Sequence, residues 1–130
     1  MRIACIGLLA ALSVTACAQA QAPQVAAIAD TEPDVTERVA AVLNQAAQGT
    51  LTAEPLTENA RAALDAPQME AMRTLLRDCA NMGALELLAR TTKGEERQYQ
   101  YRAPCGGKPL LVEINFGKGA RISHLRVRPG

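Results

Sequence analysis

The stretch LLVEINFGKGARISHLRVRP, residues 110–129, decides how this chain folds. Its beginning alternates between apolar and other side chains, which is typical of a strand with one buried face. The glycines at 117 and 119 predict a turn, and residues 122–127 predict a strand that returns beside the first. The side chains expected to face the core of the first strand are Leu110, Val112, Ile114 and Phe116.

The returning strand carries an irregularity. Ile122 is out of phase with Leu125 and Val127, so the alternation breaks after the first residue of the strand. An extra residue in one strand of an antiparallel pair produces this break in phase. We therefore expect a β-bulge near residues 123–124.

Two more strands are expected before this hairpin, over residues 85–91 and 97–102. The Leu, Glu and Ala content of the first also suits a helix, but its alternation and the Lys-Gly-Glu turn that follows favour a strand. The sequence APCGGKP, residues 103–109, predicts the loop that leads into the C-terminal hairpin. The four strands together predict an antiparallel meander.

Helical periodicity precedes the strands. Apolar residues three and four apart predict a first helix that begins at residue 34 or 36 and ends at 48. A short helix is expected over residues 57–64, and a third from Pro67 to a stop near Gly83. Helices followed by a run of strands define an α+β fold. We expect two to three N-terminal helices packed on a curved four-stranded antiparallel sheet.

The chain has 130 residues, a size that suits one folded domain, which is expected over residues 34–130. Two Tyr and one Phe are its only aromatic residues, so the core must consist mainly of Leu, Val, Ile and Met. Such a core buries a modest area per residue, and a covalent cross-link would stabilise it.

Charge is divided unevenly along the chain, although the net charge is only +1. Residues 30–82 hold nine acidic residues against four arginines, whereas residues 83–130 hold four acidic residues against nine Lys or Arg. The two halves are expected to attract each other, or the basic half meets an anionic partner such as lipid headgroups. No dense basic run with interleaved aromatics is present, so nucleic acid is not an expected partner.

The N-terminus has the composition of an export signal. Arg2 precedes an apolar run from Ile3 to Val14, which is too short to span a bilayer as a permanent helix. Small residues follow this run. The chain is therefore expected to be exported.

Two cleavage sites compete after the apolar run. The sequence VTAC, residues 14–17, resembles a bacterial lipobox, which gives a signal over residues 1–16 and a lipidated Cys17 as the first mature residue. An ordinary signal peptidase would instead cleave after Ala20 or Ala22, because small residues precede these bonds. We favour the lipoprotein and keep ordinary cleavage as the alternative.

Residues 17–33 are rich in Ala, Gln and Pro and are expected to form a flexible tether. With lipid on Cys17, this tether would hold the domain on the periplasmic side of a bacterial envelope. Ala18 is not an acidic retention residue, which by resemblance to Gram-negative lipoproteins predicts the outer membrane. Without the lipid, a soluble periplasmic protein is expected.

Two cysteines, Cys79 and Cys105, lie outside the signal region. In an oxidising compartment the default for such a pair is a disulfide. Their spacing excludes a CxxC redox motif. A single histidine and the lack of a further thiol argue against a zinc site, and no metal or cofactor is expected.

Few side chains could carry acid–base chemistry. His124 is the only histidine, and Glu113, Tyr99 or Tyr101 could be its partner on the expected sheet. An exposed histidine and two tyrosines that pack against helices explain the same residues more simply. The chain has no nucleophile elbow, zinc-protease helix, phosphate loop or SxxK motif, so catalysis is not expected.

The expected fold has helices followed by a curved meander, and the meander ends in FGKGARISHLRVRP, residues 116–129. This arrangement resembles that of the nuclear-transport-factor-two-like, or cystatin-like, superfamily. The resemblance covers about residues 35–129. Small secreted domains of this superfamily occur alone or appended to periplasmic serine hydrolases. Members that isomerise or dehydrate substrates place Asp, His or Tyr in the concave pocket of the sheet, and this chain has no Asp on its expected strands. The resemblance therefore implies a binding or accessory domain.

We expect a non-enzymatic envelope protein that binds a small molecule or a partner protein. One alternative is a small isomerase- or hydratase-like enzyme with a pocket in the sheet. A pocket that opens onto His124 paired with Glu113 would favour the enzyme, and a pocket filled by Leu, Ile and Met would favour the binding domain. Another alternative is an inhibitor of a secreted hydrolase that inserts the loop over residues 103–109.

Overall fold

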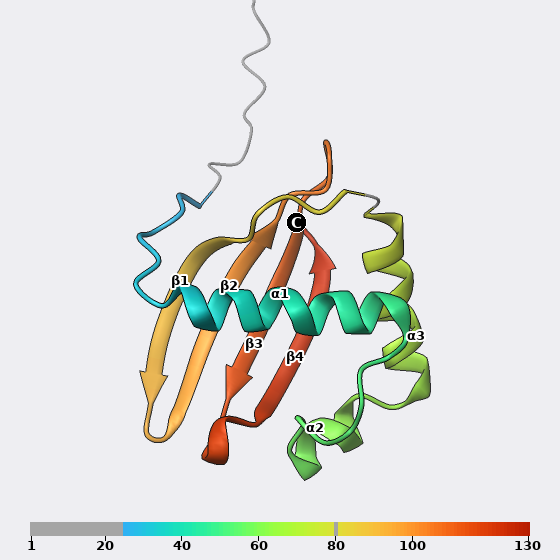
Figure 1. Cartoon of the computed structure of the whole chain (residues 1–130), viewed down its shortest axis with the longest axis vertical. Coiled ribbons are helices and arrows are strands. Elements are labelled where there is room, and N and C mark those ends of the chain that lie inside the picture. The colour runs from blue at the N-terminus through green and yellow to red at the C-terminus, as the bar shows by residue number, and fades with distance from the viewer. Residues whose placement is uncertain (1–24, 80) are drawn as a thin grey trace, which may run out of the picture.

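The computed structural model describes residues 25–79 and 81–130, which form three α-helices and a four-stranded antiparallel sheet (Figure 1). The sheet has the order β1-β2-β3-β4, so each strand pairs with its neighbour in sequence. This arrangement confirms the α+β class and the meander. The elements are α1 (Pro33–Gln48), α2 (Glu58–Ala63), α3 (Ala66–Asp78), β1 (Glu86–Lys93), β2 (Glu96–Ala103), β3 (Leu110–Phe116), the 3₁₀ turn η1 (Lys118–Ala120) and β4 (Ile122–Pro129).

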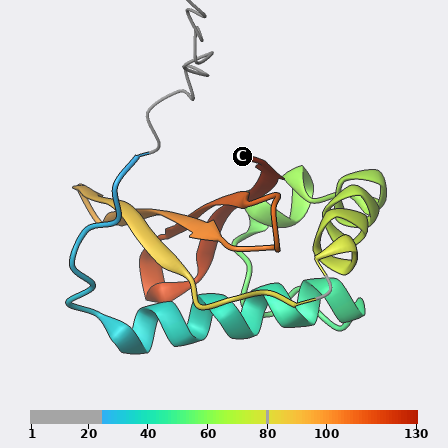
Figure 2. The same ribbon diagram turned by 90° about the horizontal axis from the view of Figure 1, so that it is seen from above.

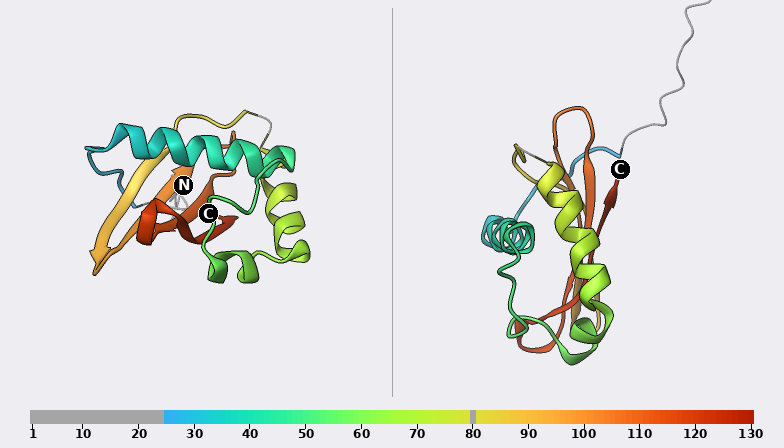
Figure 3. Two further views of the ribbon diagram at one scale, coloured as in Figure 1. Left: turned by 60° about the horizontal axis from the view of Figure 1, so that its bottom comes forward. Right: turned by 90° about the vertical axis from the view of Figure 1, so that its right-hand side faces the viewer.

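Helix α1 lies across one face of the sheet, and no helix of the described chain covers the opposite face (Figure 2). Helices α2 and α3 pack beside β4, and α3 also packs against α1. Seen along the sheet, α1 stands alone on its side (Figure 3, right). The residues of α1 that enter the core are Val39, Val42, Leu43 and Ala46, none more than 5% exposed.

Capping residues set the helix boundaries. Gly49 ends α1 in the left-handed conformation, with φ of 72°, which glycine adopts without steric cost. Thr57 Oγ1 accepts a hydrogen bond of 3.2 Å from the N–H of Ala60 and caps α2. Asp65 Oδ1 accepts a hydrogen bond of 3.0 Å from the N–H of Gln68 and caps α3. The expected beginnings of all three helices are confirmed to within about a turn.

The strand register confirms the bulge expected near residues 123–124. Along β3 the register with β4 is regular as far as Asn115, which pairs with His124. Phe116 then pairs with Ile122, so one residue of β4 is left over at this point. A second register shift lies in β1 between Leu87 and Ala89, where the sequence had no clear signal.

Helix α3 ends earlier than the sequence predicted. The apolar pattern continues to Met82, but the helix stops at Asp78 and Cys79 is its C-terminal cap. The following segment pairs instead with the loop between β2 and β3, through a bridge between Met82 and Cys105 and a 2.9 Å hydrogen bond from the N–H of Gly83 to the Pro104 carbonyl. Tertiary pairing therefore overrides the helical period here.

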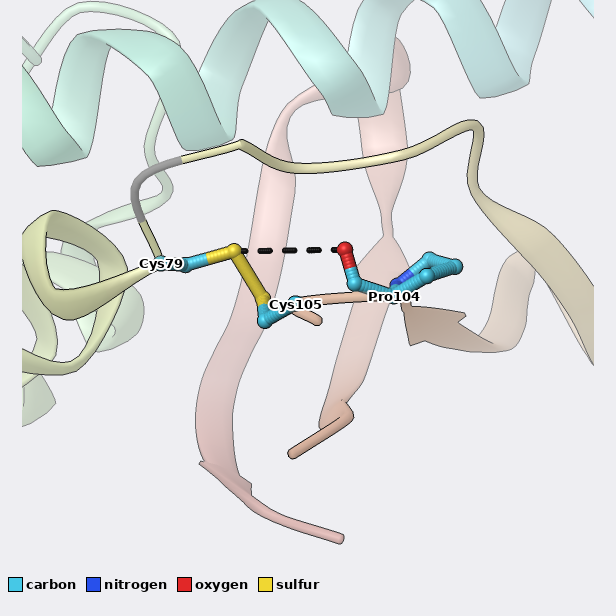
Figure 4. Close-up of a disulfide and its surroundings, with 3 residues drawn as sticks. All are labelled: Cys79, Pro104 and Cys105. Carbon is cyan, nitrogen blue, oxygen red and sulfur yellow. Dashed lines mark hydrogen bonds between the residues drawn. A yellow bond between two sulfur atoms is a disulfide. The ribbon is translucent and has the colours of Figure 1, made fainter. Parts of the chain in front are cut away.

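The expected disulfide between Cys79 and Cys105 is present (Figure 4). The two Cα atoms lie 5.0 Å apart, and Cys79 Sγ lies 4.0 Å from the Pro104 carbonyl oxygen. The bond joins the C-terminal end of α3 to the loop between β2 and β3, 26 residues further along the chain. It encloses the whole first hairpin of the sheet.

Residues 25–32 form neither helix nor strand, yet hydrogen bonds hold them against the sheet. The N–H of Ile28 donates to the Leu87 carbonyl at 2.8 Å. Arg102 Nη1 donates to the Val25 carbonyl, also at 2.8 Å. This part of the expected tether therefore lies in a set position beside β1.

Glu32, directly before α1, joins this segment to the sheet. Its carboxylate forms an ion pair with Arg90 of β1 and accepts a 3.1 Å hydrogen bond from the Tyr99 hydroxyl. Arg97 Nη1 lies 3.8 Å from the same carboxylate. One acidic side chain thus connects the start of α1 with two strands.

Within the described residues, no helix has the length and apolar character needed to cross a bilayer. Four expectations fall outside the described residues. They are the signal over residues 1–16, the alternative cleavage after Ala20 or Ala22, the lipidation of Cys17, and the first part of the tether. They stay predictions from the sequence.

Candidate functional site

The four candidate catalytic side chains are divided between the two faces of the sheet. Successive residues of a strand point to opposite faces. Tyr99 and Tyr101 of β2 point toward α1, whereas Glu113 of β3 and His124 of β4 point away from it. The structure brings Glu113 and His124 together. Tyr99 borders the depression that these two side chains line, although it is 1% exposed, and Tyr101 does not border it, so the four do not line one pocket.

The face of the sheet beneath α1 is filled by side chains. Tyr99 and Tyr101 are each 1% exposed, and their stacked ring centroids lie 6.2 Å apart. The ring of Phe116 meets Tyr99 edge-on at 5.8 Å. Burial raises the pKa of the Tyr101 hydroxyl, which lies 3.1 Å from Thr36 Oγ1. This hydroxyl is therefore a weaker acid than that of an ordinary tyrosine.

The opposite face, called the open face below, presents polar side chains. His124 Nε2 lies 3.4 Å from one carboxylate oxygen of Glu113, and Arg128 Nη2 lies 3.6 Å from the other. A depression of about 210 Å³ lies among these side chains. The residues of the open face that line it are Ala89 and Thr91 of β1, Gln98 and Gln100 of β2, Glu113 and Asn115 of β3, and His124 of β4, and Tyr99 of β2 also borders it.

Glu96, at the start of β2, organises one end of the open face. One of its oxygens accepts hydrogen bonds from Gln98 Nε2 at 3.0 Å and from Asn115 Nδ2 at 3.2 Å. The other accepts a bond of 3.2 Å from Ser123 Oγ. Sequence reasoning missed this network, and its one available signal was the predicted bulge near Ser123, because a bulge redirects side chains.

The bonds to Glu96 stabilise its charged form. The hydrogen bond from Gln98 is the largest cause that lowers the pKa of Glu96, followed by the bond from Ser123 and the nearby charges of His124 and Lys93. A carboxylate with a lowered pKa in the folded state stabilises the fold above its ordinary pKa near 4.5. That stabilisation is lost as the pH falls through the lowered value.

We expect Gln98→Ala to raise the pKa of Glu96 toward its ordinary value, because the largest stabilising bond is removed. A ¹³C NMR titration of the Glu96 carboxyl measures this shift. Gln100→Ala, on the same face of β2 but outside the network, is the matched control and should leave the pKa unchanged. Equal titration curves for Gln98→Ala and the wild type would contradict the assigned network.

The loop considered as an inhibitory element projects at one end of the sheet (Figure 3). The disulfide at Cys105 and the hydrogen bond to the Pro104 carbonyl hold its base, while Gly106, Gly107 and Lys108 are exposed. A groove of about 560 Å³ lies between this loop and the end of α3. The inhibitory role of residues 103–109 stays a prediction.

No group of three or more His, Cys, Asp or Glu side chains in residues 25–79 and 81–130 is placed to hold a metal ion. A comparison with known protein families, curated proteins and solved structures finds no match to this chain. The expected resemblance to the nuclear-transport-factor-two-like superfamily stays a prediction from the sequence.

Proposed function

We propose that this protein is a non-enzymatic binding domain of a bacterial envelope, exported and anchored by lipid on Cys17, which receives a polar partner on its open face. The observation that carries the proposal is the division of the sheet. One face is filled beneath α1, and the other directs hydrogen-bonding side chains toward solvent. The sequence VTAC at residues 14–17 supports the anchor.

The same division argues against an enclosed active site at His124 and Glu113. Sites for small substrates occupy pockets of roughly 300–1,000 Å³ that bury most of the ligand. The depression on the open face has about 210 Å³. The side chains of His124 and Glu113 beside it are 44% and 26% exposed, so water has access to both. Such a surface fits a partner that lies on the sheet.

The open face suits a partner that supplies hydrogen bonds. Gln98, Gln100 and Asn115 each carry a donor and an acceptor in their side-chain amides. Glu96 already bonds to the amides of Gln98 and Asn115, so these side chains lose less conformational freedom when a partner binds. The preorganised amides favour a polar partner over an apolar one.

Site-specific photo-crosslinking in cells tests the open face. We expect a benzophenone amino acid at Gln100 to give a cross-linked product with an envelope protein. The same residue at Glu37, exposed on α1, is the matched control and should give none. The product from position 100 should be lost when Gln98 and Asn115 are replaced by alanine. Equal products from both positions would contradict the proposed face.

Mass spectrometry of the mature protein tests the anchor separately. We expect an acylated N-terminal peptide that begins at Cys17, and Cys17→Ser should move the protein out of the membrane fraction. An unmodified N-terminus after Ala20 or Ala22 would contradict the lipid anchor. The cross-linking result would still decide whether the open face binds a partner.

One observation favours a second function, a small isomerase- or hydratase-like enzyme. The depression of the open face is lined by both His124 and Glu113, which is the arrangement expected above of an enzyme. The two side chains lie 3.4 Å apart, which is close enough for the carboxylate to orient the imidazole as a base. Such an enzyme would exchange a proton next to a carbonyl group. NMR of simple ketones and enoyl thioesters in deuterated water tests this. Exchange that is lost in His124→Ala would favour the enzyme, and equal exchange in both proteins would favour the binding domain.

A further inference from the structure

The segment over residues 25–29 exposes apolar side chains. Val25 is 61% exposed and Ile28 is 47% exposed, and within the described residues these are the large apolar side chains that face solvent. The segment that contains them, VAAIA, residues 25–29, carries no charge. Single exposed apolar residues are common on protein surfaces, so the position of these two decides whether they have a role.

The two side chains are held in place. The carbonyl of Val25 accepts from Arg102 at 2.8 Å, and Arg102 Nε in turn donates to Glu86 at 2.5 Å. The N–H of Ile28 donates to Leu87 at 2.8 Å. The backbone of the segment is therefore fixed on the start of β1 and the end of β2, while its apolar side chains remain in solvent.

This segment lies at the end of the sheet that also holds the C-terminus and the loop between β2 and β3 (Figure 1). The N–H of Gly130 donates to the Pro109 carbonyl at 2.9 Å, which joins the C-terminus to that loop. Lys108 and Arg128 are exposed at the same end. Apolar and cationic side chains at one end of a domain are a combination that binds at the surface of an anionic bilayer.

The position of Cys17 in the sequence brings this end close to a membrane. Eight residues lead from Cys17 to Val25. An extended chain spans at most about 3.6 Å per residue, so Val25 lies within about 29 Å of a lipidated Cys17. A flexible chain of this length has a mean span of about 16 Å. The end of the sheet with the exposed segment is thus the part of the domain held nearest to the bilayer.

We propose that residues 25–29 are a second membrane contact, in which Val25 and Ile28 insert into the lipid surface beside the anchor. A lipid chain and an adjacent apolar or basic contact together bind a membrane more firmly than the chain alone. The contact sets the orientation of the domain. The end of the sheet that carries Val25 and the loop between β2 and β3 then faces the bilayer. This inference rests on the proposed lipid anchor.

The lack of tryptophan in the chain allows a direct test. Val25→Trp places a fluorescent reporter in the segment, and Thr92→Trp places one near the far end of β1 as the matched control. Thr92 lies five residues beyond Leu87, which is about 17 Å along the strand. Each full-length lipidated chain is reconstituted in vesicles of phosphatidylethanolamine and phosphatidylglycerol, with and without bromine on the acyl chains.

We expect brominated lipid to quench the tryptophan at position 25 and to leave that at position 92 unchanged. Adding Ile28→Ser to the first chain should weaken the quenching, because one of the two inserted side chains is lost. If the protein floats with the vesicles but position 25 is not quenched, or if both positions are quenched equally, the membrane contact is overturned. The lipid anchor would still be supported by the flotation. Protein that carries no acyl group and does not float would overturn the anchor, and the contact with it.

Discussion

Removal of the disulfide by Cys79→Ala together with Cys105→Ala is expected to lower the free energy of unfolding by about 3.5 kcal/mol. The bond closes a loop with a sequence separation of 26, and the chain-entropy model assigns about this value to such a loop. Small domains have only about 5–15 kcal/mol of stability in total. The disulfide therefore supplies a large part of the stability of a domain with few aromatic side chains.

Urea denaturation followed by circular dichroism measures this loss. Cys5 and Cys17 are replaced by serine in both chains, so that no other thiol can exchange with the disulfide. Dithiothreitol should lower the stability of the parent chain to that of the variant and should not affect the variant. Equal urea midpoints without reductant would contradict a stabilising role for the bond.

Replacement of Phe116 by alanine should lower the free energy of unfolding by about 3–5 kcal/mol. The ring is 1% exposed and meets Tyr99 edge-on at 5.8 Å. The guanidinium of Arg38 lies 4.8 Å from the ring centroid on the α1 side. Alanine would leave a cavity between α1 and the sheet, because neither the helix nor the strands can close around it completely.

Two further variants of β3 show whether this cost arises from the face beneath α1. Phe116→Leu keeps most of the volume and should cost less than about 1.5 kcal/mol. Leu111→Ala removes a partly exposed side chain from the other face of the same strand, and a change of less than about 1 kcal/mol is expected. Thermal denaturation of the three variants ranks their losses of stability. Similar losses for Phe116→Ala and Leu111→Ala would contradict the division into a filled and an open face.

Local sequence signals predicted most of the secondary structure because the residues that carry them act locally. Thr57, Asp65 and Gly49 cap helices through their own side chain or backbone, whatever the rest of the fold does. The alternation in β3 predicted its buried residues, since the strand has one face in the core. The phase break at Ile122 predicted the bulge for the same reason.

Features that depend on contacts between distant parts of the chain could not be predicted from local sequence signals. The apolar period that ends in Met82 predicted a longer α3, but pairing with the loop around Cys105 ends the helix at Asp78. The predicted bulge near Ser123 was the one sequence signal for the network around Glu96, and it did not identify Glu96 as the centre, because the partners come from β3 and β4 as well as β2. Such partners become neighbours only when the strands pair.

The sequence by itself determined the α+β class and the strand order of the meander. It predicted the pairing of Cys79 with Cys105, as the default for two cysteines in an oxidising compartment. It also placed Glu113 among the possible partners of His124. Only the tertiary structure decided which candidate side chains share a face. Tyr99 pairs with Ile114 across β2 and β3, so the tyrosines face α1 and Glu113 faces solvent. A register shifted by one residue would reverse this assignment, and burial of the apolar face against α1 is the physical reason that it does not occur.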